Sequence, residues 1–137
     1  MGVDVLPVEA RESSDIESAF STMIKGRVHG VVVTADSKYI SDRTRISVLA
    51  LQAGLPTMFW TREFAEVGGL MTYGTNVPYL YRRAATYVDK ILKGARPSDL
   101  PVEQPTIFEL FINLKTAKAL GIKVPQLILL RADQVIE

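Results

Sequence analysis

Short apolar runs alternate with amphipathic helical segments in the first half of the chain. The runs are residues 3–8, 28–34 and 57–60, and helical patterns occupy residues 12–25 and 41–53. Strands that alternate with helices pair in parallel through right-handed crossovers. This order therefore predicts the α/β class, with a parallel, Rossmann-like sheet. Because the run at residues 28–34 is almost unbroken, we expect it to be a central strand that is covered on both faces.

The second half of the chain begins with a short strand and a long helix. Residues 70–73 form a fourth apolar run, and Asn76 is expected to cap a helix that extends to Lys93. The proline-rich stretch at residues 95–105 is expected to be a connection on the surface. After it, the pattern predicts a strand at residues 106–113, a helix capped by Asn113, and a closing helix or turn at residues 124–137.

Composition excludes several classes of function. Apolar residues make up 47% of the 137-residue chain and charged residues 23%, which suits one compact domain. The formal net charge of +1 provides no basic surface, so nucleic acid is not an expected partner. The sequence has no cysteine, one histidine (His29) for which we expect a structural or surface role, and no phosphate-binding loop. We therefore expect no catalytic residue, no metal site and no cofactor.

Polar and aromatic residues gather at the carboxyl ends of the predicted strands, where open α/β sheets bind ligands. They are Thr34, Asp36, Ser37, Thr61, Arg62, Glu63, Phe64, Tyr73 and Gly74. Asp36 can fix an amino or hydroxyl group, and Ser37 and Thr61 can donate to a carboxylate. Phe64 or Tyr73 can stack on an apolar portion of a ligand. This group of residues is the candidate ligand-binding site.

The same residues have alternative interpretations. Asp36, Ser37 and Ser41 can simply cap the following helix, and Arg62 and Glu63 can form an ordinary surface pair. Asp36 and Glu63 also allow a small α/β enzyme that uses them as an acid–base pair. The enzyme has less support, because no other catalytic signature accompanies these two carboxylates.

Several phrases in the second half are specific enough to indicate a family. They are "YRRAATYVDKILKGARPSDLPVEQPT", "FINLKTAKALG" and "LLRADQVIE". These phrases resemble the C-terminal part of the substrate-binding proteins of ABC transporters, in the tryptophan/tyrosine-type group. The resemblance extends back to the start of the chain, but it covers only the later part of a complete family member.

The resemblance implies how the chain is organised. It implies one α/β domain over residues 1–137, built like the C-terminal lobe of a type I periplasmic binding protein. Residues 1–73 would be the βαβαβ core of this lobe, and residues 107–137 the return strand and closing helices. Residues 74–106 would hold the crossing, the proline-rich connection and the long helix, which would belong to an otherwise missing second lobe.

The resemblance also implies a function. It implies a non-catalytic solute-binding component of an ABC-type importer, or a truncated fragment of one, with a small amino-acid-like or aromatic ligand in an interlobe cleft. A transporter permease would be the partner of the complete protein. The alternative is a cytoplasmic ligand-sensing or interaction domain.

Location and assembly follow from the same comparison. Complete family members are periplasmic or extracytoplasmic, whereas the start of this sequence has no secretory signal, so the chain as written is expected to be cytoplasmic. Surfaces made to contact an absent lobe would expose apolar area. We therefore expect a homodimer or a higher oligomer, with the long helix exchanged between chains.

Overall fold

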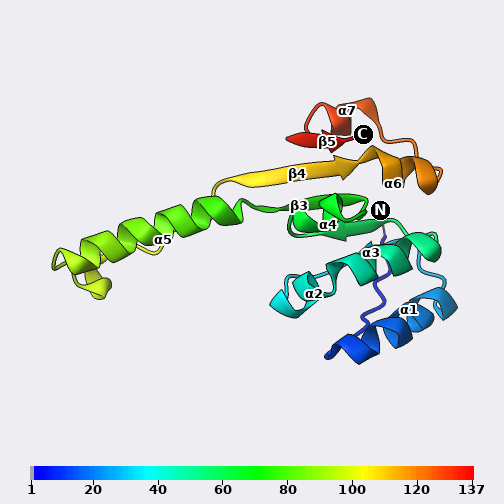
Figure 1. Ribbon diagram of the computed structural model, residues 1–137, viewed down its shortest axis with the longest axis horizontal. Helices are drawn as coiled ribbons and strands as arrows, with labels where there is room; N and C mark the ends of the chain where they lie inside the picture. The colour runs from blue at the N-terminus through cyan, green and yellow to red at the C-terminus, as the bar shows by residue number, and fades with distance from the viewer. Residues whose placement is uncertain (1) are drawn as a thin grey trace.

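The computed structural model describes residues 2–137, in which five short strands form one sheet (Figure 1). The strands are β1 (Val31–Val32), β2 (Thr57–Phe59), β3 (Met71–Thr75), β4 (Phe108–Asn113) and β5 (Gln134–Ile136). The helices are α1 (Ile16–Lys25), α2 (Ser37–Ser41), α3 (Arg43–Gln52), α4 (Glu63–Glu66), α5 (Val77–Leu92), α6 (Leu114–Ala119) and α7 (Gln126–Leu129). Short 3₁₀ turns occupy Ser13–Asp15 and Pro97–Asp99.

The sheet is mostly parallel, and its strands lie side by side in chain order. β1 pairs with β2, β2 with β3, and β4 with β5 in parallel, whereas β3 and β4 are antiparallel. The predicted α/β class is therefore confirmed. Between β3 and β4 the chain leaves the sheet through α5 and returns, so this antiparallel pair joins α5 to the body of the protein (Figure 1).

The hydrophobic core lies between β2 and the helices that pack on it. Its buried residues are Ile16, Phe20, Ile46, Ala50, Leu55, Phe59 and Phe64. They belong to α1, α3, β2 and α4, except Leu55, which lies just before β2. Residues spaced three or four apart on α1 and on α3 are the buried ones, as an amphipathic helix requires.

Three strand predictions differ from the structure. Residues 3–8 form no strand but an exposed segment, and β1 lies at an edge of the sheet, not at its centre. The side chain of Val32 in β1 is accordingly 72% exposed. An apolar run indicates that a segment can be covered on both faces, but it does not supply the neighbouring strand. β5 was not predicted, because its three residues are too few to show an alternating pattern.

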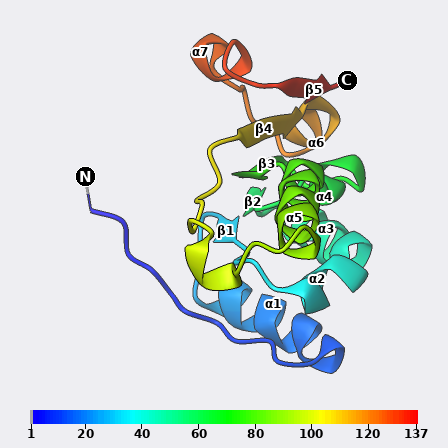
Figure 2. The ribbon, with the colours of Figure 1, turned by 90° about the vertical axis from the view of Figure 1, so that its left-hand side faces the viewer.

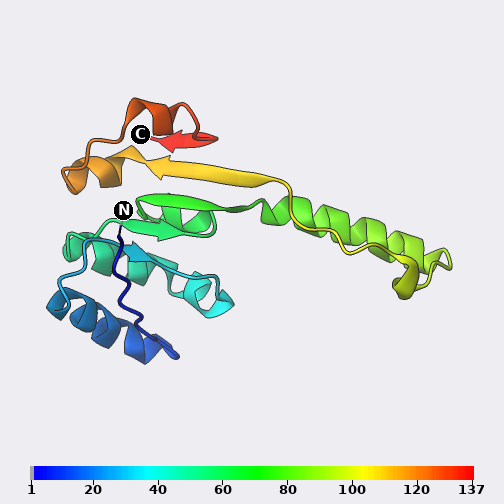
Figure 3. The same ribbon diagram turned by 180° about the vertical axis from the view of Figure 1, so that it is seen from behind.

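α5 projects from the body (Figures 1 and 3). Asn76 caps it as predicted, since its Oδ1 accepts a hydrogen bond from the backbone N–H of Tyr79 at 2.7 Å. No residue of α5 is buried. The connection at residues 95–106 returns beside the helix (Figure 3), where the Tyr87 hydroxyl donates to the Pro101 carbonyl at 2.7 Å. The helix is therefore held by its cap and by this connection, and not by the core.

Asn113 is expected to contribute strongly to stability, because its side chain makes two buried contacts. Its Oδ1 accepts from the Thr116 N–H at 3.0 Å and its Nδ2 donates to the Ala65 carbonyl at 2.9 Å, with the residue only 5% exposed. Asn113→Ala removes both hydrogen bonds and leaves the Thr116 N–H and the Ala65 carbonyl without this partner. We therefore expect a loss of about 2–3 kcal/mol of unfolding free energy in urea denaturation. Asn113→Ser keeps the capping oxygen and should lose less. A loss below about 0.5 kcal/mol for the alanine variant would contradict this role.

Candidate functional site

A small hollow lies where β2 and β3 end and α5 begins. Thr61, Arg62 and Glu63 line it after β2, Gly74 lines it from β3, and Glu109 lines it from β4. The carboxyl ends of neighbouring parallel strands are the usual ligand-binding edge of such a sheet. The hollow encloses about 10 Å³, close to the least space that holds one water molecule. A ligand of amino-acid size would therefore lie over the hollow and not inside it.

Thr61 and Glu63 are joined, and Arg62 is left free between them. The Thr61 hydroxyl, in a residue that is 8% exposed, donates to the Glu63 carboxylate. Arg62 is exposed, and its guanidinium makes no ion pair or side-chain hydrogen bond with any residue in the 2–137 range. The structure thus does not contain the Arg62–Glu63 surface pair that we considered. A free guanidinium presents a planar set of donors that matches a carboxylate.

Gly74 allows β3 to pass close to the end of β2. A Cβ atom at this position would lie 1.7 Å from the Trp60 carbonyl oxygen, a distance that no side chain can occupy. Glycine is therefore required by the close approach of two backbones. Trp60 and Gly74 both line the hollow, so this contact forms part of its wall.

The start of α5 is connected to β4 through one side chain. Besides capping the helix, Asn76 donates from Nδ2 to Glu109 Oε1 at 2.6 Å. The neighbouring aromatic rings of Tyr73 and Phe108 stack with centroids 5.7 Å apart. Tyr73 is half exposed but does not line the hollow, because Thr72 and Gly74 line it and successive residues of a strand point to opposite faces. Polar and aromatic side chains thus lie close together where β3 continues into α5.

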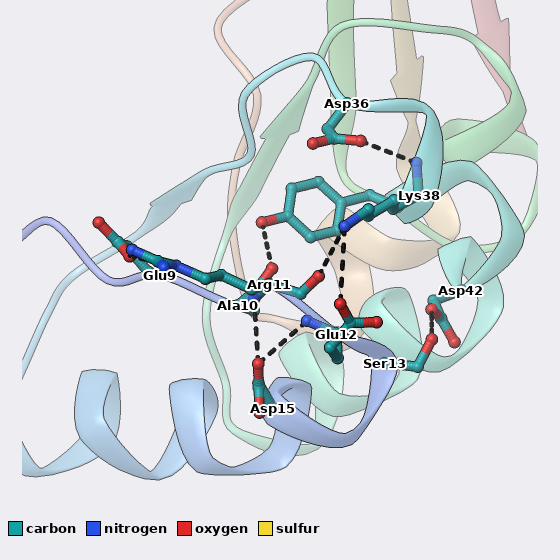
Figure 4. A network of polar contacts seen from close by, with 10 residues as sticks. Glu9, Ala10, Arg11, Glu12, Ser13, Asp15, Asp36, Lys38 and Asp42 are labelled. Carbon is teal, nitrogen blue, oxygen red and sulfur yellow. Dashed lines mark hydrogen bonds and ion pairs between the residues drawn. The ribbon is translucent and has the colours of Figure 1, made fainter.

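Thr34, Asp36 and Ser37 lie apart from the hollow and follow β1. All three are exposed, and none of them lines the hollow. Asp36 Oδ1 accepts from the Lys38 backbone N–H at 2.9 Å, so Asp36 caps α2 (Figure 4). Ser41 ends α2 and caps no helix. The capping interpretation therefore describes Asp36 in this structure, and a ligand contact of Asp36 stays a prediction.

Phe64 belongs to the core. It is 0% exposed and stacks on Phe59 with ring centroids 4.1 Å apart, and Trp60 tilts against it at 4.9 Å. A ring with no exposed surface cannot stack on a ligand. We therefore exclude Phe64 from the residues that could contact a ligand directly. Its ring packs against Trp60, which lines the hollow.

Sequence reasoning missed Trp60 and Glu109, which both line the hollow. Trp60 ends a short apolar run and has the pattern of an ordinary core residue. Glu109 is the one charged residue of β4, a signal that could have indicated a functional position. Its position beside Gly74 depends on the antiparallel register, which no local pattern reveals.

A second, mostly apolar depression separates α5 from the connection at residues 95–106. Arg83 and Glu103 bridge it, with Arg83 Nε donating to Glu103 Oε2 at 3.0 Å. This hydrogen bond lowers the pKa of the Glu103 carboxyl, and the positive charge of Arg83 acts in the same direction. Both side chains are more than a third exposed, so the pair contributes little to stability.

Residues 2–137 contain neither a metal-binding cluster nor a helix that could span a membrane. No group of three or more histidine, cysteine, aspartate and glutamate residues is placed to hold a metal ion. In the same residues, no helix has both the length and the apolar character needed to cross a membrane.

Comparisons with known proteins indicate the family and the fold. A family model described as "ABC transporter substrate binding protein" matches residues 1–136. No curated protein matches the sequence. A conserved domain protein from Vibrio cholerae O1 biovar El Tor is similar in structure, with a TM-score of 0.85 and 28% identity over 92% of this chain and 42% of that chain.

Two other solved structures are similar. An ABC domain in complex with L-Trp from Streptococcus pneumoniae has a TM-score of 0.85 and 28% identity, over 93% of this chain and 43% of that chain. A ligand-free, open substrate-binding protein from Clostridium difficile has a TM-score of 0.64 and 24% identity, over 93% of this chain and 42% of that chain, and shows the fold alone. The chain thus spans less than half the length of these proteins.

Proposed function

Because this chain belongs to the family of ABC transporter substrate-binding proteins, we propose that it forms one wall of the solute-binding cleft of an importer. Proteins of this family are generally non-enzymatic and typically extracytoplasmic or periplasmic, and we propose a non-catalytic role here. The observation that carries the proposal is the polar hollow at the carboxyl ends of β2 and β3, beside the crossing to α5. In a complete protein, the permease of the transporter is the partner.

An amino acid, aromatic in its side chain, is the proposed class of ligand. The similar structure from Streptococcus pneumoniae holds L-Trp, which supports this choice. Arg62, which has no ion pair within residues 2–137, can bind a ligand carboxylate, and Glu63 and Glu109 can accept hydrogen bonds from an ammonium group. Tyr73 is half exposed but lies outside the lining of the hollow, so its ring can stack only on a part of the ligand that extends beyond the hollow.

This single wall is expected to bind its ligand weakly. Binding clefts of this kind gain most of their contacts when two walls close on the ligand and exclude water. The hollow encloses only about 10 Å³, so it would contact one side of the ligand. We expect a Kd of about 1 mM, which corresponds to about 4 kcal/mol of binding free energy.

Titration of the protein with L-Trp, followed by amide chemical shifts in NMR, tests this function. Shifts are expected to concentrate at residues 60–63, 72, 74, 75 and 77, which line the hollow. Arg62→Ala should weaken binding by at least about tenfold, because a charge-assisted hydrogen bond contributes about 1.5–3 kcal/mol. Arg96→Ala is the matched control, since Arg96 pairs with Asp99 beyond the far end of α5 and should leave binding unchanged.

Two results would contradict the proposal. One is the absence of any saturable shift at residues 60–63, 72, 74, 75 and 77 with L-Trp, L-Tyr or L-Phe. The other is equal binding by the Arg62→Ala and Arg96→Ala variants, which would show that the guanidinium next to the hollow does not contact the ligand.

A further inference from the structure

The side chain of Asn76 makes two hydrogen bonds where β3 continues into α5. Its Oδ1 accepts from the Tyr79 backbone N–H at 2.7 Å, and its Nδ2 donates to Glu109 Oε1 at 2.6 Å. The first bond caps α5, and the second reaches β4, the strand next to β3 in the sheet (Figure 2). A helix cap requires only the oxygen atom. The bond from Nδ2 therefore needs a separate explanation.

The antiparallel register of β3 and β4 brings these two side chains together. Gly74 pairs with Glu109, and the Asn76 N–H continues the ladder by donating to the Ile107 carbonyl at 3.2 Å. Residues 74 and 76 are two positions apart in an extended segment, so they point to the same face of the sheet. Asn76 is therefore the diagonal neighbour of Glu109, within reach of a long side chain.

Gly74 leaves the position directly opposite Glu109 without a side chain. An ordinary pair in an antiparallel ladder has Cβ atoms about 4.5–5.5 Å apart, and such neighbours orient each other. Here that neighbour is excluded, because a Cβ atom on Gly74 would lie 1.7 Å from the Trp60 carbonyl oxygen. Glu109 lines the hollow at this place, and its contact with Asn76 is the one that orients its carboxylate.

The contact with Asn76 leaves the carboxylate of Glu109 able to bind a cation. A carboxylate accepts about four hydrogen bonds, and the Asn76 amide takes one place on Oε1. An amide is a neutral donor, so it fixes the carboxylate without cancelling its negative charge. Glu103, in contrast, is paired with the positive charge of Arg83. Glu109 is thus held in one orientation and keeps its charge for a ligand.

Glu63, the other carboxylate of the hollow, is held in a different way. Its partner is the hydroxyl of Thr61, only two residues earlier in the chain. That contact lies within one segment and connects Glu63 to no other element. The contact of Glu109 joins β4 to the first turn of α5, so it links the hollow to the helix that follows it.

We propose that Asn76 is a positioning residue, which holds the Glu109 carboxylate at the hollow so that Glu109 selects ligands with an ammonium group. This inference rests on the proposed function, in which Arg62 binds the ligand carboxylate. Glu109 adds the contact that distinguishes an amino acid from a carboxylic acid of the same shape. The Asn76 amide also caps α5, so ammonium binding and the position of the first turn of α5 are coupled reciprocally.

Two probes separate recognition of the amino group from the other contacts. They are L-Trp and indolepropionate, which has the indole ring and the carboxylate of L-Trp but no amino group. Both are titrated into the full chain and followed by NMR. We expect the unchanged chain to prefer L-Trp about tenfold, because a hydrogen bond between two charged groups is among the stronger ones.

Glu109→Gln tests the carboxylate itself. Glutamine keeps the shape of the side chain and an oxygen that accepts from Asn76, but it removes the negative charge. We expect the Kd for L-Trp to rise about tenfold, whereas indolepropionate should bind at least as tightly as before. The preference for L-Trp should therefore disappear.

Asn76→Ser tests the positioning role. Serine keeps a capping oxygen for α5, but its side chain lacks the amide that reaches Glu109. We expect the Kd for L-Trp to rise about threefold to tenfold, with little change for indolepropionate. In the Glu109→Gln background the same substitution should change the Kd for L-Trp by no more than about twofold, because Asn76 acts through the carboxylate.

Asn113→Ser is the matched control, since it alters the other asparagine cap in the same way. Asn113 caps α6 and donates to the Ala65 carbonyl, and neither of these residues lines the hollow. The preference for L-Trp over indolepropionate should stay unchanged. A loss of cap stability alone would therefore not reproduce the result expected for Asn76→Ser.

The side-chain amide signals of Asn76 report the coupling to α5. They are assigned by their loss in the Asn76→Ser variant. We expect them to shift when L-Trp binds and to shift much less with indolepropionate, because only the ammonium group competes for and polarises the Glu109 carboxylate.

The outcomes distinguish this inference from the proposed function. If neither probe gives a saturable shift with the unchanged chain, the proposed function is contradicted and this inference falls with it. If L-Trp binds, three results overturn this inference alone. They are equal weakening of both probes by Glu109→Gln, unchanged binding by Asn76→Ser, and an equal effect of Asn76→Ser with and without Glu109→Gln.

Discussion

Gly74→Ala is expected to destabilise the fold by about 3 kcal/mol or more, and to distort the candidate site as well. The added Cβ would lie 1.7 Å from the Trp60 carbonyl oxygen, so the ends of β2 and β3 must separate. The three atoms nearest to this Cβ are the carbonyl oxygen, the carbonyl carbon and the Cα atom of Trp60, and backbone atoms cannot rotate away as a flexible side chain can. Separation would also move Glu109, which pairs with Gly74 across the β3–β4 ladder.

Urea denaturation followed by tryptophan fluorescence measures this effect, because Trp60 is the only tryptophan and lies at the contact. Gly30→Ala is the matched control, since its Cβ would lie 3.4 Å from the nearest backbone atom, the Pro56 carbonyl oxygen. It should cost about 1 kcal/mol or less. Both variants are compared at one protein concentration, because association changes apparent stability. Equal stability of the two variants would contradict the steric argument.

Phe64→Ala is expected to lower the unfolding free energy by about 3–5 kcal/mol, the range for truncating a fully buried phenylalanine. Phe64 has no exposed surface, and its ring stacks on Phe59 with an interplanar angle of 11°. Its removal leaves a cavity between α4 and β2, and Trp60 loses the ring against which it packs. Chemical denaturation should therefore show a lower midpoint with an unchanged slope.

Phe108→Ala separates this core effect from the loss of any aromatic ring. Phe108 is 47% exposed and stacks on Tyr73 at the crossing, so its truncation should cost about 1 kcal/mol or less. If Phe64→Ala cost no more than Phe108→Ala, Phe64 would not be a core residue in solution, and its exclusion from the ligand site would have to be reversed.

The sequence predicted part of the lining of the hollow, and the contact of these residues with a ligand stays a prediction. Thr61, Arg62, Glu63 and Gly74 were all nominated from the sequence, and they surround one hollow. These residues were nominated by the rule that ligands bind beyond the carboxyl ends of parallel strands. Thr34, Asp36 and Ser37 follow the same rule, yet they lie after β1 and away from the hollow. The rule predicts at which end of the strands a ligand binds. It does not predict which of the residues at that end lie close together, because this depends on which strands are neighbours in the sheet.

Local patterns alone determined the class of the fold, the helices and their caps. Asn76 and Asn113 accept the helix-starting hydrogen bonds that their sequence positions predict, because a cap involves residues only three positions apart. The tertiary structure decided what depends on distant partners. Within residues 2–137, β1 is an edge strand and residues 3–8 pair with no other strand, whereas Phe64 is buried and Glu109 lines the hollow. Strand pairing and burial are set by contacts between segments far apart in the chain, and the periodicity of one segment carries no information about which other segment it meets.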